Sequence, residues 1–156
     1  MITRFFGGNV RSQIEGCIAA SHKLIALYLL EKYRAVFAEE RAVALAVAVS
    51  NELFGRPPGN EAGQSFLTAN RSLVEEHLAR LKNEPELRQI MSTVVGLKLS
   101  IARNSGRLTP EMQNWAMKLS ELGILFPTSE MTLPDSLEGL QQQVRAFEIK
   151  VLGLGQ

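Results

Sequence analysis

Cysteine and histidine are scarce in this chain of 156 residues. With Cys17 as its single cysteine, the chain can form neither an internal disulfide nor a metal site built on paired cysteines. The residues three positions before His22 and His77 are Ala19 and Val74, which excludes the paired Glu-x-x-His motif of di-iron helical bundles. The sequence also lacks the motifs of phosphate loops, dinucleotide-binding folds, zinc peptidases and serine hydrolases. We therefore expect no metal, no cofactor and no catalytic residue.

Long apolar runs and an excess of one charge are also missing. The two most apolar runs, at 24–30 and 42–49, are far shorter than the roughly 18 to 20 residues that cross a bilayer. Arg11 and Glu15 interrupt the region where a secretory signal would need an apolar core. A net charge of +1 disfavours a protein built mainly to bind polyphosphate or an anionic membrane. These features, with the lone cysteine, predict a soluble cytoplasmic protein without a membrane partner.

Signals for β-strands are nearly absent, although the segment RAVALAVAVSNELFGRPPG at 41–59 alternates large and small apolar residues as a buried strand does. Its small residues are alanines, which favour helix over strand. On a helix, Val43 and Val47 share one face, and the Gly-Arg-Pro-Pro run at 55–58 is a typical stop signal. Because this helix is apolar on most sides, we expect it to be buried at the centre of the fold.

Other helix signals extend along the whole chain. Between Asn9 and Gly55 there is no proline, so the sequence does not fix whether this stretch is one helix or two, and we expect a turn around 36–40. Further helices are predicted at 61–82, from a capping box at Asn83 and Glu86 to Gly106, from Thr109 to Gly123, and from a cap at Asp135 and Glu138. The prediction is an all-α, single-domain bundle of about six helices, with largely antiparallel neighbours. This domain covers 1–156, including a flexible N-terminal segment at 1–8 and a frayed tail at 152–156.

The two histidines lie on apolar stripes of their predicted helices, with Ile18 and Ile25 around His22 and Leu73 and Leu81 around His77. We interpret both first as core histidines whose ring nitrogens meet protein partners. The alternative is a ligand site or a general base. Since Asn70 lies on the same side of its helix as His77, this alternative predicts a small apolar ligand, or an enzyme site, near His77 and Asn70, with His22 as a weaker candidate.

The last helix carries a narrow apolar seam with alternating steps of three and four residues, typical of a coiled coil. Packing against its own bundle is the first interpretation, because two heptads are too few for a free coiled coil. Pairing with a second copy of the chain is the alternative. The seam consists of Leu137, Leu140, Val144, Phe147 and Val151.

The region from Arg88 to Arg107 contains no acidic residue, and it ends in a helix, a glycine turn and a capped helix. This layout resembles the helix-turn-helix of DNA-binding regulators, which would place Arg103 and Arg107 at the nucleic acid. The second helix lacks a strongly basic face, so a nucleic-acid partner is the least favoured hypothesis. The leading hypothesis is a non-enzymatic helical interaction or regulatory protein, as a homodimer or with a helical protein partner.

Overall fold

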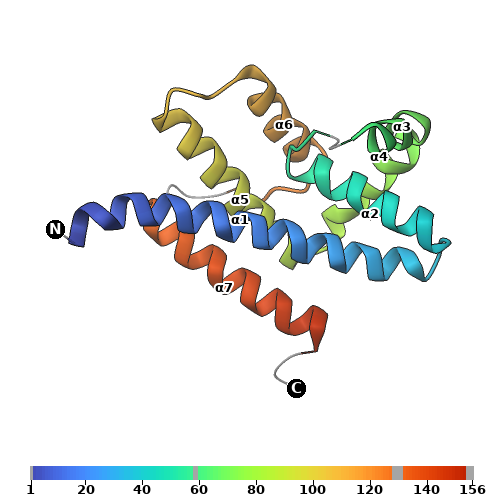
Figure 1. The fold of residues 1–156 in the computed structure, drawn as a ribbon, viewed down its shortest axis with the longest axis horizontal. Helices are drawn as coiled ribbons and strands as arrows, with labels where there is room; N and C mark the ends of the chain where they lie inside the picture. Colours follow the sequence, from blue (N-terminus) through green and yellow to red (C-terminus); the bar gives the residue numbers. More distant parts are fainter. Residues whose placement is uncertain (1, 58–59, 128–131, 154–156) are drawn as a thin grey trace.

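The computed structural model describes the backbone of residues 2–57, 60–127 and 132–153, and the side chains from Val10 onward within these ranges. This part of the chain is all-helical and forms one bundle, as predicted (Figure 1). Within it there are seven α-helices rather than about six, and one short 3₁₀ helix. The helices are α1 (Ile2–Arg34), α2 (Glu39–Leu53), α3 (Glu61–Ala69), α4 (Arg71–Arg80), η1 (Leu81–Asn83), α5 (Pro85–Asn104), α6 (Pro110–Glu121) and α7 (Leu133–Leu152).

Helices α1 and α2 form a hairpin, with the turn where the sequence predicts it. The carbonyl of Tyr33 accepts hydrogen bonds from the backbone N–H groups of Val36 and Phe37, which ends α1. Across the turn, both ends of the Arg34 guanidinium donate to the Glu39 carboxylate at 2.9 Å. The sequence leaves open one helix or two, and the structure has two.

The N-terminal start of α1 differs from the prediction. Asn9 is a typical N-cap residue, and the sequence predicts that the first helix starts there, but the helix begins at Ile2 and Asn9 lies inside it. Gly7 and Gly8 lie within this helix. Each glycine lowers helix stability by about 1 kcal/mol, and the helix continues through both. The side chains of residues 2–9 and all of 154–156 lie outside the described part, and the flexibility of 1–8 and of the tail stays a prediction.

The predicted helix at 61–82 is divided by Asn70. Asn70 has φ −123° and ψ 32°, outside helical geometry, and it serves as both the C-cap of α3 and the N-cap of α4. The Phe66 carbonyl accepts both from the Asn70 backbone N–H at 2.9 Å and from the Asn70 side-chain amide at 3.1 Å. A short polar side chain that competes for backbone groups in this way is a known cause of helix breaks. The chain then continues through η1 into α5.

Prolines set the starts of the later helices. Thr109 caps α6 as predicted, accepting from the Met112 N–H at 3.2 Å. The predicted capping box at Asn83 and Glu86 is wrong, because Pro85 occupies the first turn of α5 and makes Glu84 the N-cap. The predicted cap at Asp135 and Glu138 is also wrong: Thr132 caps α7, and the backbone N–H of Asp135 is its donor.

The core lies where α1, α2, α5 and α7 meet. Helix α1 is the longest element and runs along the molecule, with α7 on one side and α2 and α5 on the other (Figure 1). Fully buried side chains come from each of the four, including Ile25, Leu45, Val94 and Leu140. Within the residues described, no helix is both long enough and apolar enough to span a membrane.

Candidate functional site

An open groove of about 940 Å³ lies between one face each of α2, α3 and α6. We call it the α2 groove. On the α2 side the groove is lined by four residues that share one side of the helix, Val43, Ala44, Val47 and Ala48. The opposite walls carry Ala62, Gly63, Phe66 and Leu67 from α3 and Glu111, Asn114, Trp115 and Lys118 from α6.

This groove corrects the expectation that α2 is buried on most sides. One face of α2 does enter the core, where Leu45 and Val49 are fully buried. The opposite face does not, since Val43 is 39% and Val47 46% exposed. The face of α2 that lines the groove is therefore half-exposed rather than part of the core.

Two basic side chains that line the α2 groove, Arg71 and Lys118, form ion pairs. Arg71 pairs with Glu52 at 3.0 Å, and Lys118 pairs with Glu75 at 2.9 Å. At one end the Trp115 indole N–H donates to the Leu53 carbonyl at 3.2 Å, and its ring lies against Gly55. An apolar floor with a charged, pre-ordered edge is the usual build of a protein interface.

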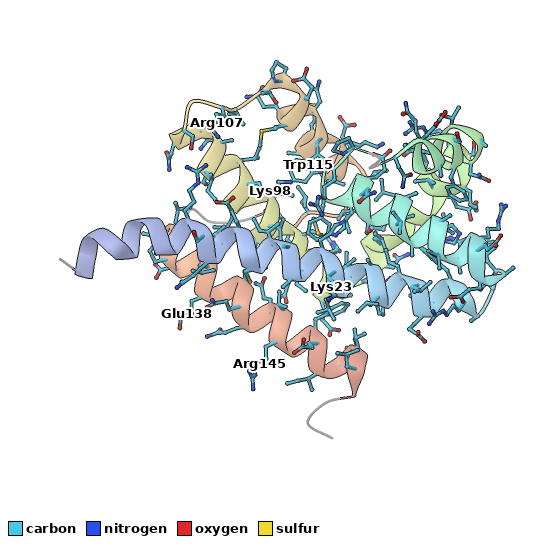
Figure 2. All side chains as sticks on the ribbon, in the orientation of Figure 1. Lys23, Lys98, Arg107, Trp115, Glu138 and Arg145 are labelled. Atoms are coloured by element: carbon cyan, nitrogen blue, oxygen red, sulfur yellow. The ribbon has the colours of Figure 1, made fainter. Side chains whose placement is uncertain are left out.

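A second cavity of about 420 Å³ lies between α1, α5 and the turn that follows α2, and we call it the His22 cavity. Figure 2 labels two of its basic residues, Lys98 on α5 and Arg107 in the turn after α5. Its walls are Arg11, Glu15, Ile18, Ala19, His22, Phe54, Arg56, Lys98, Ile101, Ala102, Ser105, Arg107 and Met112. Arg56 also lines the α2 groove.

His22 sits in this cavity with a defined tautomer. Its Nε2 lies 3.2 Å from the Asn51 Oδ1, which can only accept, so the ring proton is on Nε2. Nδ1 is then the acceptor toward Arg56 Nη1 at 3.5 Å. Burial lowers the pKa of His22 below its usual value, and the charge of Arg56 lowers this pKa further, so the ring is neutral near pH 7.

Lys98 is partly buried at the border of the two cavities. Its Nζ donates to the Phe54 carbonyl at 2.7 Å and lies 4.7 Å from the centre of the Trp115 ring. Burial lowers the pKa of Lys98, and the nearby Arg56 has the same effect. The sequence pattern does not indicate that Lys98 lines a cavity, because its partners, Phe54 and Trp115, come from the end of α2 and from α6.

His77 and Asn70 line neither of these two cavities. The His77 ring is only 9% exposed and makes edge-to-face contacts with Tyr33 and Phe37, at centroid distances of 4.9 and 5.9 Å. The Asn70 amide group is engaged by the Phe66 carbonyl and by Arg41. Of the three predicted ligand residues, the structure thus brings only His22 to a cavity.

The seam of α7 faces the chain's own bundle. Leu137, Leu140 and Phe147 are buried in the core, and Val144 and Val151 pack against it. Phe147 contacts the Tyr28 ring of α1 edge-to-face, with centroids 5.1 Å apart. The seam thus packs against its own bundle, which is the first of the two interpretations given above. Pairing of α7 with a second copy of the chain stays a prediction.

The remaining candidates are placed as follows. Arg103 and Arg107 are both exposed near the end of α5, and only Arg107 lines the His22 cavity. Cys17 is partly buried on α1, and burial raises the pKa of its thiol. Among the described residues, no cluster of three or more His, Cys, Asp or Glu is arranged to hold a metal ion.

Comparison of the chain with protein-family models, curated proteins and solved structures finds no match.

Proposed function

We propose that the protein is a non-enzymatic helical interaction protein that self-associates, and that the α2 groove is the surface where a second copy docks. The observation that carries this proposal is the exposure of Val43 and Val47 on the apolar wall of a 940 Å³ groove. Removing such side chains from water contributes about 25 cal/mol per Å² of buried apolar area. Ala44 and Ala48, which flank the valines, leave room for another helix to approach closely.

The charges along α2 favour a second copy as the occupant. Glu40 lies in the first turn of α2 and Arg56 lies just beyond its C-terminal end, and both line the groove. Val47 and Ala48 lie midway between them in the sequence. In a two-fold arrangement with antiparallel α2 helices, Glu40 of each copy meets Arg56 of the partner subunit, and the two Val47 side chains meet near the axis. A surface that is complementary to itself in this way is what a two-fold dimer requires.

The test is sedimentation velocity from 1 to 100 μM with a matched pair of variants. Val47→Glu places two carboxylates face to face near the proposed axis. We expect it to raise the dimer dissociation constant by about 30-fold or more, the effect of about 2 kcal/mol at an interface hot spot. The control is Val36→Glu, the same change at a 75% exposed valine in the α1–α2 turn.

Both variants should keep the helical circular dichroism of the wild type, because both valines are exposed at the surface. The proposal is wrong if the wild type is monomeric at 100 μM. It is equally wrong if Val36→Glu weakens association as much as Val47→Glu, since a general effect of charge would then explain both.

We also propose that the protein resides in the cytoplasm. Its single cysteine is a free thiol in the structure, and burial raises the pKa of this thiol, which slows its oxidation. This state suits a reducing compartment. Fractionation of cells that express the tagged chain would test the location, and recovery outside the cytoplasm would refute it.

A further inference from the structure

The His22 cavity carries an excess of positive charge that its own residues leave unbalanced. Four basic side chains line it, and its single acidic residue, Glu15, pairs with Arg11 at 3.5 Å. Arg56, Lys98 and Arg107 therefore face a common space of about 420 Å³. Lys98 is partly buried while Arg56 and Arg107 are exposed, and an anion that enters this space is attracted by all three like charges.

The same cavity has an apolar side. Ile18, Phe54, Ile101 and Met112 line it, and the Phe54 ring is buried against the edge of His22 at a centroid distance of 4.8 Å. A bare inorganic anion would leave this apolar wall in contact with water. A ligand that meets both walls must carry its charge at one end and hydrocarbon at the other.

Hydrogen-bond donors are present at the charged end. An ammonium group has three N–H bonds, and the Phe54 carbonyl accepts one from Lys98. The Arg56 guanidinium lies beside His22, and Arg107 follows Gly106 in an exposed turn, so neither is enclosed by the core. Arginine and lysine give charge-assisted hydrogen bonds to carboxylates, which are about twice as strong as neutral ones.

We propose that the His22 cavity binds a small amphipathic organic anion, whose carboxylate lies among Arg56, Lys98 and Arg107 and whose hydrocarbon body packs on the half-buried side chains of Ile101 and Met112. The cavity volume of about 420 Å³ equals about fourteen water volumes at roughly 30 Å³ each. A carboxylate on a chain of about eight carbons fits this space. The inference stands without self-association, because Lys98 and Arg107 line this cavity and not the α2 groove, and only Arg56 is shared by the two.

Octanoate is the probe, and octan-1-ol and inorganic phosphate are its two controls. We expect octanoate to bind at least tenfold more tightly than either one, measured by titration calorimetry at pH 7. Octan-1-ol has the hydrocarbon without the charge, and phosphate has the charge without the hydrocarbon. If either control binds as tightly as octanoate, the ligand need not be both anionic and apolar, and the proposal fails.

Two arginines near the end of α5 supply a matched pair of variants. Arg107→Gln removes one cation of the cavity, and we expect octanoate affinity to fall at least threefold. Arg103→Gln makes the same change one turn earlier, at an exposed arginine that does not line the cavity, and affinity should stay unchanged. Equal losses in the two variants would show a general surface charge effect and overturn the site. Arg56 is left intact because it also lines the α2 groove.

The two histidines give a readout inside the protein itself. A bound carboxylate stabilises the protonated imidazole, so octanoate should move the NMR titration midpoint of His22 upward. His77 lines neither cavity, and its midpoint should not move. A shift of both histidines, or of His77 alone, would contradict the proposed location. The charged groups that share the cavity with His22 are Arg11, Glu15, Arg56, Lys98 and Arg107.

Discussion

Gly55 is the position where a single methyl group should be most costly. It ends α2 with φ +68°, a left-handed conformation that costs a residue with a side chain about 1 kcal/mol. A β-carbon at this position would also lie 2.8 Å from Cε2 and 2.9 Å from Cδ2 of the Trp115 ring. The ring cannot easily retreat, because its N–H is bonded to the Leu53 carbonyl and Lys98 lies over its face.

Overpacking of this kind adds about 1 to 3 kcal/mol. We therefore expect Gly55→Ala to lower the free energy of unfolding by about 3 kcal/mol, which lowers Tm by about 6 to 12 °C in a chain of this length. The control is Gly106→Ala, which has nearly the same φ, +69°, and nothing within 4 Å of the added carbon. It should lose only about 1 kcal/mol.

The assay is urea and thermal unfolding followed by circular dichroism, at one protein concentration for all variants, because self-association would make Tm depend on concentration. A double variant with Trp115→Ala separates the two costs. In that background Gly55→Ala should cost no more than Gly106→Ala does in the wild type, since the ring is gone. Equal losses for Gly55→Ala and Gly106→Ala in the wild type would refute the argument that Trp115 makes Gly55 necessary.

Three further predictions follow from the core and its polar contacts. Leu140→Ala, at a fully buried position, should lower stability by about 2 to 5 kcal/mol, while sedimentation of the folded variant should show unchanged association if the α7 seam is internal. Burial lowers the pKa of His77 below 6.5 in the folded state, so the unfolded chain takes up the proton first. The contribution of neutral His77 to the free energy of unfolding is therefore fully present above pH 6.5 and is lost as the pH falls. Because phenylalanine cannot take up a proton, the urea midpoint should drop less between pH 7.5 and 5 in His77→Phe than in the wild type. Tyr28→Phe removes the hydroxyl that donates to the Glu84 carboxylate and should lower the free energy of unfolding by about 1 to 3 kcal/mol in the same assay; a wild-type urea midpoint would contradict this role.

The parts of the fold that the sequence predicts correctly depend on local chemistry. Thr109 before Pro110 and the glycines at 106 and 123 give the right helix ends, because each of these acts within a few residues. The errors arise where two local signals compete. Asn83 with Glu86 matches a capping box, but the fixed φ of Pro85 favours the first helical position, so the helix starts at the proline and Glu84 becomes its N-cap.

The break at Asn70 shows a different limit. The sequence around it has neither glycine nor proline, and apolar positions continue at helical spacing on both sides. In the structure the break is marked by the non-helical backbone angles of Asn70 and by the hydrogen bond from its side-chain amide to the Phe66 carbonyl. The sequence signal for this break is an asparagine inside a helical pattern. This signal is weak because asparagine also occurs within helices.

The candidate sites were harder to predict than the fold, because each is made by elements far apart in the sequence. His22 was recognised as a candidate, but its cavity depends on Arg56 and Lys98, which are 34 and 76 positions away. The pairing of His77 with Asn70 rested on a shared helix face, and the break at Asn70 removes that continuity. The rings of Tyr33 and Phe37 then enclose His77 from another helix and its turn.

Helix α2 shows why an apolar pattern alone does not distinguish core from interface. A helix with apolar residues on most sides is stable only if each side is covered. In this fold Leu45 and Val49 are fully buried, whereas α3 and α6 line the groove beside Val43 and Val47 and leave these side chains 39% and 46% exposed. The second face therefore needs a partner outside the chain, or it must tolerate contact with water. Exposed valine side chains favour an occupant for the α2 groove, and Glu40 and Arg56 at its two ends are the reason for proposing that this occupant is a second copy of the chain.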